Sequence, residues 1–481
     1  MTRAVVVGSG PNGLAAAATL VAAGVTVHVI EAADELGGGA RNSVPLLAGL
    51  IQDHCAAVHP MAAASPYLRD LDLPGVEWAL PEIDCAHPLD DGDAVLLRRS
   101  IAETAEGLGR DGWRWRALFG VPSARFAALS EDIFRPLLGI PRHPFLLARF
   151  GAVAAPPPTW VARVFSQERT RALFLGVAAH AFQRLDLPLV TGIGAGIITA
   201  GHAVGWPVIA GGTGALTDAV IARLREQGVT FETGTRIRSR RELPPHDIAL
   251  LDVHPHAVAE ILGESLPARD GKAFRRFRAG PAAFKVEFAV AGGVPWRSPE
   301  VGRAGTVHLG GSAREIVAVE RETSRGRMPA RPFVLVGQQH VADPQRSVGD
   351  VHPVYAYAHV PAGYTGDATD AIVAQFERFA PGFTERVVAT RVLTATDLSR
   401  ENPNFVGGDI LTGAKTPRQF TLGPRLSAQP YDTGVPGYYL CSAATPPGPG
   451  VHGLCGVNAA RRALQSVASL EIREDAGVHR S

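Results

Sequence analysis

A glycine-rich turn near the start of the chain constrains its fold more than any other feature. An apolar run over residues 3–7 leads into this turn, residues 8–13, and an alanine-rich stretch over residues 14–23 follows it. The pattern predicts a strand, a tight turn and a helix in direct succession. Such a turn holds the diphosphate of a dinucleotide, because its glycines allow close approach of the backbone and the helix N-terminus supplies free N–H groups. The residues predicted to contact the ligand here are Gly8, Gly10, Pro11, Asn12 and Gly13.

An acidic residue at the end of the next strand supports a dinucleotide site. This strand is predicted over residues 25–30 and ends at Glu31, 23 residues after Gly8, which is close to the usual spacing of about 20. A carboxylate at this position accepts hydrogen bonds from both ribose hydroxyls and repels a 2′-phosphate. We include the neighbouring Ala32 in the predicted site.

The residues after Glu31 discriminate between NAD and FAD. An NAD domain of the dehydrogenase type continues into a further crossover helix, whereas residues 35–41 are too rich in glycine for a helix. We interpret this segment as a second phosphate-binding loop, with a flexible turn unrelated to any ligand as the alternative. The sequence here resembles the FAD-binding family that includes amine oxidases and phytoene desaturases, in which a glycine doublet and a following arginine contact the FAD diphosphate. The resemblance assigns this contact to Gly37, Gly38, Gly39 and Arg41.

A second glycine signature lies close to the end of the chain. A strand predicted over residues 437–443 leads into the segment 445–453, and an alanine-rich helix is predicted from residue 454 to about residue 470. Too few residues follow for a complete second βαβ unit, so a separate NAD site is rejected. The resemblance implies that this helix N-terminus faces the edge of the flavin that becomes negative on reduction; a tight turn before a terminal helix is the simpler alternative. The implied contacts are Ser442, Gly450, Val451, His452 and Gly453, with an adenine contact from the backbone of Ile237.

The predicted elements between these two ends fall into two groups. Residues 206–251 have α/β character, residues 100–203 are mostly helical, and later strands form a second sheet, with the strands predicted at 280–291, 306–310, 333–341 and 355–360 and a helix at 367–379. We therefore predict an α/β fold in which a Rossmann-type, glutathione-reductase-like FAD-binding domain is interleaved with an α+β substrate domain carrying a mixed sheet and a helical insert. The predicted FAD-binding domain comprises residues 1–75, 206–280 and 400–481; the predicted substrate domain comprises residues 76–205 and 281–399, with the insert at 100–203.

The resemblance extends over nearly the whole chain and is closest to the phytoene-dehydrogenase-related subgroup of bacteria. Besides the two ends, it rests on short stretches at residues 53–60, 205–207, 211–212, 284–285, 307–311 and 380–383. Carotenoid desaturases usually have a shorter, aromatic-bearing version of the first stretch and a proline where His452 stands, so the departures concern the substrate and not the flavin. The resemblance implies hydride transfer from a C–H bond of a hydrophobic, isoprenoid-like substrate to the flavin, with formation of a double bond.

Four side chains are candidates for catalysis. His54 and His59 follow the glycine doublet and His452 lies in the second signature, where an imidazole could exchange a proton near neutral pH. Their simpler roles are core packing for His54 and His59 and helix capping for His452. Lys285 stands on a predicted apolar strand, where a buried ammonium needs a partner. The resemblance implies a water-bridged contact from Lys285 to flavin N5, and exposure on the other face of the sheet is the alternative.

The same fold also allows functions other than desaturation. A saturase or isomerase using reduced flavin, an amine or amino-acid oxidase with an aromatic cage, and a binding or assembly protein with structural FAD all fit the fold. The sequence contains no second complete dinucleotide-binding fingerprint. This absence favours oxygen or a quinone over NAD(P) as the electron acceptor. No metal is predicted, because the acid and histidines of residues 252–256 lack further ligands at metal spacing. Cys455 could attach flavin covalently, although a buried thiol is the ordinary interpretation.

Composition excludes several classes of protein. Lys plus Arg is 47 and Asp plus Glu is 46, so no excess of positive charge exists for nucleic acid. Hydrophobic residues make up 46%, which is typical of a folded chain. The first residues lack the apolar segment of a secretory signal, which predicts a cytoplasmic protein. The uncharged stretch 187–217 is too rich in glycine and proline for a membrane span. Its first part, residues 187–205, is expected to line a substrate tunnel, with peripheral membrane contact as a further expectation.

Overall fold

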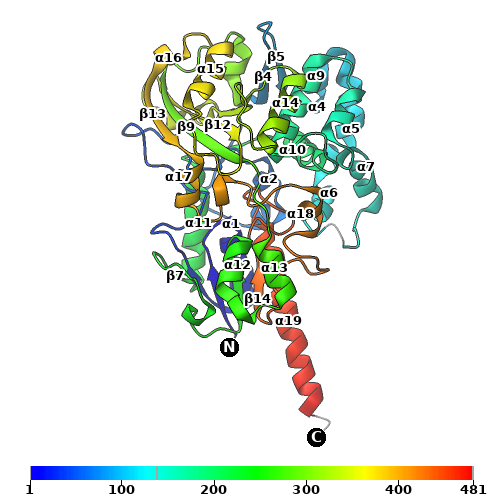
Figure 1. Ribbon diagram of the computed structural model, residues 1–481, viewed down its shortest axis with the longest axis vertical. Coiled ribbons are helices and arrows are strands. Elements are labelled where there is room, and N and C mark those ends of the chain that lie inside the picture. Colours follow the sequence, from blue (N-terminus) through cyan, green and yellow to red (C-terminus); the bar gives the residue numbers. More distant parts are fainter. Residues whose placement is uncertain (1, 137–138, 479–481) are drawn as a thin grey trace.

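A computed structural model describes residues 2–136 and 139–478 of the chain, and the burial of side chains up to residue 468. Two sheets and a group of helices make up the molecule (Figure 1). The first sheet has five strands in the order β14-β8-β1-β2-β7, all parallel. Their bounds are β1 Arg3–Val7, β2 Thr26–Ile30, β7 Thr230–Glu232, β8 Ile248–Leu251 and β14 Tyr438–Leu440. The three central strands β8, β1 and β2 are mostly buried and rich in aliphatic residues, as expected for a parallel sheet covered on both faces.

Helices cover both faces of this sheet. One face packs against α1 (Pro11–Ala22), α11 (Thr213–Glu226) and α19 (Leu454–Val478), and the other against α12 (Pro255–Leu262) and α13 (Ala268–Arg275). Figure 1 shows α19 leaving the body of the molecule toward the C-terminus. This doubly covered parallel sheet confirms the predicted Rossmann-type fold.

The second sheet has seven strands in the order β13-β9-β12-β11-β10-β4-β5. Among the described residues the β4–β10 pair is parallel and the other pairs are antiparallel, so the sheet is mixed as predicted. The strands are β4 Ile83–Pro88, β5 Ala94–Leu97, β9 Ala282–Ala291, β10 Ala304–Leu309, β11 Val334–Gly337, β12 Val351–Val360 and β13 Val387–Leu393. Two further short strands, β3 (Trp78–Ala79) and β6 (Val208–Ile209), pair with each other.

The two faces of the seven-stranded sheet differ in polarity. Residues Val354, Ala356 and Ala358 of β12 join an apolar core with α15 (Thr369–Phe379) and α16 (Phe383–Arg386). The alternating residues Tyr355 and Tyr357 lie on the opposite face. That second face packs against the helical insert through Leu335 and Tyr355, and it also carries the polar side chains of Thr306, His308 and Tyr357.

The helical insert forms a core of its own against that polar face. This core contains Trp115, Phe119, Phe165 and Phe174, all at most 1% exposed, and α14 also packs on it. The helices of this region are α4 Ile101–Gly107, α5 Gly112–Ala124, α6 Phe126–Ile133, α7 Pro144–Ala154, α8 Pro158–Val161, α9 Glu168–Ala178, α10 Thr191–Val204 and α14 Ala313–Ser324. Short helices elsewhere are α2 Pro60–Ala63, α3 Pro66–Asp70, α17 Ala395–Glu401 and α18 Pro417–Leu422.

Several predicted elements differ from those observed. The strand predicted over residues 333–341 ends at Gly337, because Gln339–Val341 turn into a 3-10 helix. Strand β13 was not predicted, since its burial alternates weakly at the sheet edge. Helices α12, α13 and α14 were also missed. Within the described residues, no helix combines the length and the apolar character that crossing a membrane requires.

Candidate functional site

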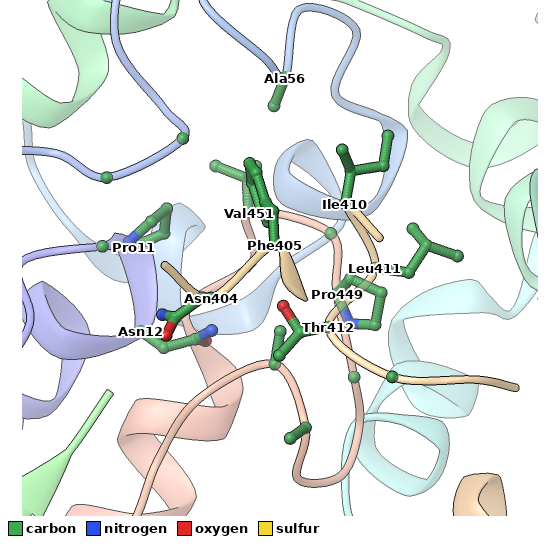
Figure 2. A pocket seen from close by; sticks show the side chains of 18 of the residues that line it. Pro11, Asn12, Ala56, Asn404, Phe405, Ile410, Leu411, Thr412, Pro449 and Val451 are labelled. Carbon is green, nitrogen blue, oxygen red and sulfur yellow. The ribbon is translucent and has the colours of Figure 1, made fainter. Parts of the chain in front are cut away.

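Both glycine signatures line one cavity of about 810 Å³. Figure 2 shows Pro11 and Asn12 of the first signature and Pro449 and Val451 of the second around this space. Two segments separated by more than 400 residues in sequence therefore converge on a single site. The cavity continues from the five-stranded sheet to the helical insert and the polar face of the seven-stranded sheet.

The first signature forms the cradle that its sequence predicts. A Cβ at Gly13 would lie 2.1 Å from the carbonyl oxygen of Gly8, and a Cβ at Gly38 would lie 2.9 Å from Cα of Gly10. A side chain at Gly13 would therefore push the helix away from the strand, and a side chain at Gly38 would push the two glycine loops apart. The buried Oδ1 of Asn12 has no partner among the described residues. The N–H of Gly13 donates to the Asp252 carboxyl at 2.9 Å. The helix N-terminus and the two closely packed glycine loops fit a dinucleotide diphosphate, whereas the unpaired amide oxygen of Asn12 needs a hydrogen-bond donor.

Glu31 ends β2 at the cavity wall. Its carboxylate accepts hydrogen bonds from the backbone N–H and the hydroxyl of Ser9, at 2.8 and 2.7 Å, and from the backbone N–H of Ala33 at 2.9 Å. These bonds fix the carboxylate at the strand end. Its place beside the loop fits the predicted ribose contact.

The second helix reaches the cavity because glycines let it pack against the first. A Cβ at Gly456 would lie 1.8 Å from the carbonyl oxygen of Asn12, and one at Gly453 would lie 2.8 Å from Cβ of Ala15. The N-termini of α1 and α19 therefore approach the cavity together. Their partial positive charges favour an anionic ligand between them.

Most predicted cofactor contacts lie in the cavity wall, and four do not. Ser442 is 1% exposed, and its hydroxyl is buried without a partner among the described residues, while three glycines act in packing rather than in lining. The predicted residues that line the cavity are Gly8, Gly10, Pro11, Asn12, Glu31, Ala32, Gly38, Gly39, Arg41, Ile237, Gly450, Val451 and His452. The predicted residues outside its wall are Gly13, Gly37, Ser442 and Gly453.

His59 lies in the cavity wall with one ring nitrogen free. The Thr213 hydroxyl donates to the carbonyl oxygen of Ala56 at 2.7 Å, so it accepts from Nε2–H of His59 at 2.9 Å. Nδ1 of His59 is therefore the unprotonated nitrogen, and it is buried without a partner among the described residues. Burial lowers the pKa of His59 to about 4, so the ring is neutral at neutral pH.

His452 caps α19. Its Nδ1 accepts the backbone N–H of Leu454 at 3.0 Å, and its own carbonyl oxygen accepts the hydroxyl of Ser65 at 2.8 Å. Burial lowers the pKa of His452 to about 4. Because its lone pair is already used by the backbone, the predicted role as a proton acceptor does not fit, and the capping alternative is observed.

Lys285 and His54 lie outside the cavity wall. The Lys285 ammonium is buried and donates to the carbonyl oxygens of Asp53 and His54, both at 2.7 Å, and to Glu287 at 2.6 Å. All three of its N–H groups are thus occupied, which leaves none for a water at flavin N5. His54 has Nε2 at 3.5 Å from a Glu401 oxygen, and burial lowers the pKa of His54 to about 4. The predicted catalytic roles of these two residues are not supported by this arrangement.

A loop that the sequence patterns did not single out forms another wall. Asn404, Phe405 and Thr412 line the cavity (Figure 2), and a Cβ at Gly39 would lie 3.2 Å from the Phe405 ring. Lys415 lines it too; its ammonium donates to the carbonyl oxygen of Leu411 at 2.8 Å, and burial lowers its pKa to about 8. Lys415 is one of three lysines in the chain, a rarity that could have marked it.

Beyond the dinucleotide cradle the cavity opens into a chamber with mostly apolar walls. The insert contributes Phe134, Leu147, Phe150, Ile193 and Ile197 to these walls. The seven-stranded sheet contributes Thr306, Leu335, Tyr355 and Tyr357, and a 3-10 helix at Ala179–Ala181 contributes His180. Such a chamber fits a mainly apolar small molecule.

Fold and site together define an α/β architecture with a Rossmann-like dinucleotide-binding domain and a separate sheet domain. A family model described as an NAD(P)-binding Rossmann-like domain matches residues 6–71. The computed structure is similar to that of an oxidoreductase from Methanosarcina mazei (TM-score 0.65, 16% identity, 96% of this chain and 100% of that one). It is also similar to putrescine oxidase bound to putrescine (TM-score 0.61, 16% identity, 97% and 99% coverage).

Among curated proteins, the chain is similar to the pyridine nucleotide-disulfide oxidoreductase domain-containing protein 2 of Mus musculus. The two are 25% identical over 330 residues, which cover 58% of this chain and 55% of that protein. The protein of the same name from Rattus norvegicus is 24% identical over 330 residues. This chain spans about half the length of the curated relatives it matches. The comparisons confirm the predicted fold class.

Proposed function

We propose that this chain is an FAD-dependent oxidoreductase that takes hydride from a C–H bond of a mainly apolar substrate. The observation that carries the proposal is the single cavity, in which a dinucleotide cradle opens directly into an apolar chamber. Bound flavin would supply the hydride acceptor. The protein's part is to hold the dinucleotide, orient the substrate and exclude water.

The residues assigned to the cofactor follow from the geometry of the cradle. The helix N-termini of α1 and α19 would face the anionic parts of FAD, and Glu31 would accept from its ribose. Lys415 is the cation in the cavity wall near the second signature and would stabilise negative charge there. Nδ1 of His59, which has no partner among the described residues, would hold a proton at the cavity wall.

Desaturation of an isoprenoid-like substrate is the activity we place first. Among the described residues, the charged side chains that line the cavity lie outside the helical insert and the strands of the seven-stranded sheet, so this part of the chamber wall offers no counter-ion to an ammonium. The full set of charged lining residues is Glu31, Glu35, Arg41, Arg236, Asp252, Glu260, Glu401 and Lys415. Oxygen or a quinone is proposed as the electron acceptor.

Amine oxidation is the second candidate, and one observation favours it. Tyr355 and Tyr357 line the cavity with rings 6.3 Å apart and inclined by 11°, an aromatic pair that could hold an amine. A purely structural FAD is less well supported, because it predicts no chamber next to the ring.

Peripheral membrane contact is part of the same proposal. Exposed large apolar side chains gather on the insert, and α7, which carries Phe145 at 91% exposure, also lines the chamber through Leu147 and Phe150. Co-sedimentation with lipid vesicles tests this, and failure to co-sediment would refute it.

Anaerobic mixing tests the activity. The chain is purified, reconstituted with FAD and mixed with a polyene or with an alkylamine while the flavin absorbance is followed. Bleaching by the polyene alone supports desaturation, and bleaching by the amine alone transfers the assignment to amine oxidation. Protein that stays colourless after reconstitution refutes the whole proposal.

A further inference from the structure

Four polar side chains interrupt the apolar walls of the chamber. Thr306 comes from β10, Tyr355 and Tyr357 from β12, and His180 from the 3-10 helix after α9. We call this group the polar corner. It lies on the polar face of the seven-stranded sheet, apart from the two glycine signatures in sequence.

Strand register brings the polar corner together. Thr306 pairs with Gly337 across β10 and β11, and Gly337 pairs with Tyr355 across β11 and β12. A Cβ at Gly337 would lie 2.2 Å from the Tyr355 ring, so the ring lies across the glycine, over the strand next to Thr306. The next row of the register joins His308 to Leu335 and Leu335 to Tyr357.

His180 is attached to this second row. Its Nε2 lies 2.8 Å from Nε2 of His308. Burial lowers the pKa of His180 to about 3 and that of His308 well below its ordinary value, so both rings are neutral and one donates to the other. Nδ1 of His180 makes no hydrogen bond to the described residues and remains for a ligand.

The hydroxyls of the polar corner are likewise unpaired within the described residues. Oγ1 of Thr306 is buried without a partner, in a residue that is 1% exposed. The Tyr355 and Tyr357 hydroxyls also have no hydrogen bond to the described residues, and burial raises the pKa of both phenols, so they keep their protons. Unpaired buried hydroxyls are unfavourable unless a ligand or water completes them.

Charge at the polar corner selects the kind of partner. The charged side chains nearest the corner are already paired: the Lys285 ammonium, 5.4 Å from the centre of the Tyr355 ring, bonds to Glu287, and Arg346 bonds to Asp53. An ammonium or a carboxylate placed here would lack a free counter-ion, whereas an uncharged group would need only hydrogen bonds.

We propose that the polar corner binds an uncharged oxygen-bearing group, a hydroxyl or a carbonyl, of an otherwise apolar substrate. This inference rests on the proposed function and defines its substrate class more closely. The phenols donate to the substrate oxygen, and His180 or Thr306 pairs with a substrate hydroxyl proton. The apolar remainder of the substrate lies along the insert toward the flavin site.

Four probes with one carbon skeleton test the proposal by calorimetric titration of the oxidised, FAD-reconstituted protein. They are geraniol, geranial, geranylamine and the parent diene without a heteroatom. We expect geraniol and geranial to bind about tenfold more tightly than the diene and the amine. Tyr357→Phe and Thr306→Val remove hydroxyls at nearly constant shape, and the preference should shrink in both while diene affinity stays unchanged.

Tyr364→Phe is the matched control, because its hydroxyl bonds to the Asp367 carbonyl oxygen away from the cavity. It should keep the full preference. Equal affinity for geraniol and the diene, no binding of geraniol, tightest binding of the amine, or a preference that survives both cavity variants would overturn the proposal. Absence of bound FAD after reconstitution would instead refute the proposed function, so the two failures are distinguishable.

Discussion

Individual side chains at this site owe their roles to the partners that the fold gives them. His452 and His59 are both histidines near the flavin site by sequence, yet the backbone occupies the basic nitrogen of His452 and leaves that of His59 free. The strand pattern left open whether Lys285 is buried or exposed; it is buried, and its ammonium is fully used by Glu287 and two carbonyl oxygens. The hydrogen bonds that a side chain already makes therefore decide whether it can still bind a ligand or exchange a proton.

Replacing Lys285 tests its role as a positioning residue. Lys285→Met leaves two carbonyl oxygens unpaired and removes one partner of buried Glu287, so we expect unfolding free energy to fall by about 3 kcal/mol. Urea unfolding measures this. Lys272→Met, on the exposed side of α13, is the control and should change stability little. Unchanged stability with a large fall in kcat would restore the catalytic role.

Lys415 provides a second residue-scale prediction. Lys415→Met removes one of the cations of the cavity wall, the one near the second signature, so FAD affinity should fall about tenfold, as measured by fluorescence titration of the apoprotein. In the unsubstituted protein, affinity should also weaken as pH rises through about 8, where Lys415 loses its proton. Lys272→Met again serves as control. An affinity independent of both changes would show that Lys415 does not face the flavin.

Elements meet at the site because small residues let them approach. Helices α1 and α19 are far apart in sequence, and Gly456 brings the second against the carbonyl oxygen of Asn12. The cradle for an anion thus depends on helix–helix packing as much as on either glycine loop.

A side chain at Gly456 should push the two helices apart. Gly456→Ala places Cβ against backbone, and we expect a loss of roughly 1–3 kcal/mol in stability together with weaker FAD binding. Gly107→Ala, in α4 with no atom within 4 Å of the new Cβ, should be neutral or slightly stabilising. Urea unfolding and FAD titration of both variants provide the comparison, and equal behaviour would contradict the packing argument.

Across the whole molecule, many histidines are buried and neutral at neutral pH. Burial lowers their pKa values from 6.5 to about 4 or about 3, in the set His54, His59, His87, His180, His202, His254, His340 and His452. An unfolded chain protonates these rings below pH 6.5 while the folded chain does not. Stability is therefore greatest above that pH and falls as the solution is acidified.

Acid sensitivity follows as a prediction. We expect the Tm to fall by more than about 10 °C when the pH is lowered from 6.5 to 4. Scanning calorimetry measures this change in Tm. Burial raises the pKa of Asp84 and Asp252 to about 7, and these two carboxyls act in the opposite direction because the folded chain keeps their protons. A Tm that is flat or rising on acidification would show that the carboxyls outweigh the histidines.

The sequence by itself determined the nucleotide-binding architecture. Gly8, Gly10, Gly13 and Glu31 act over a short stretch of chain, and periodicity of the flanking residues specifies strand and helix locally. The same holds for the second signature, whose strand, loop and helix are contiguous. Local backbone requirements of this kind are readable without knowledge of distant contacts.

Tertiary structure alone decided which side chains face the chamber. Thr306, Tyr355, Tyr357 and His180 carry no motif, and they meet only through the register of three strands and a helix end. The free nitrogen of His59 likewise depends on Thr213, distant in the chain. Contacts between remote segments follow from packing and hydrogen-bond geometry across the fold, so local sequence patterns do not predict them.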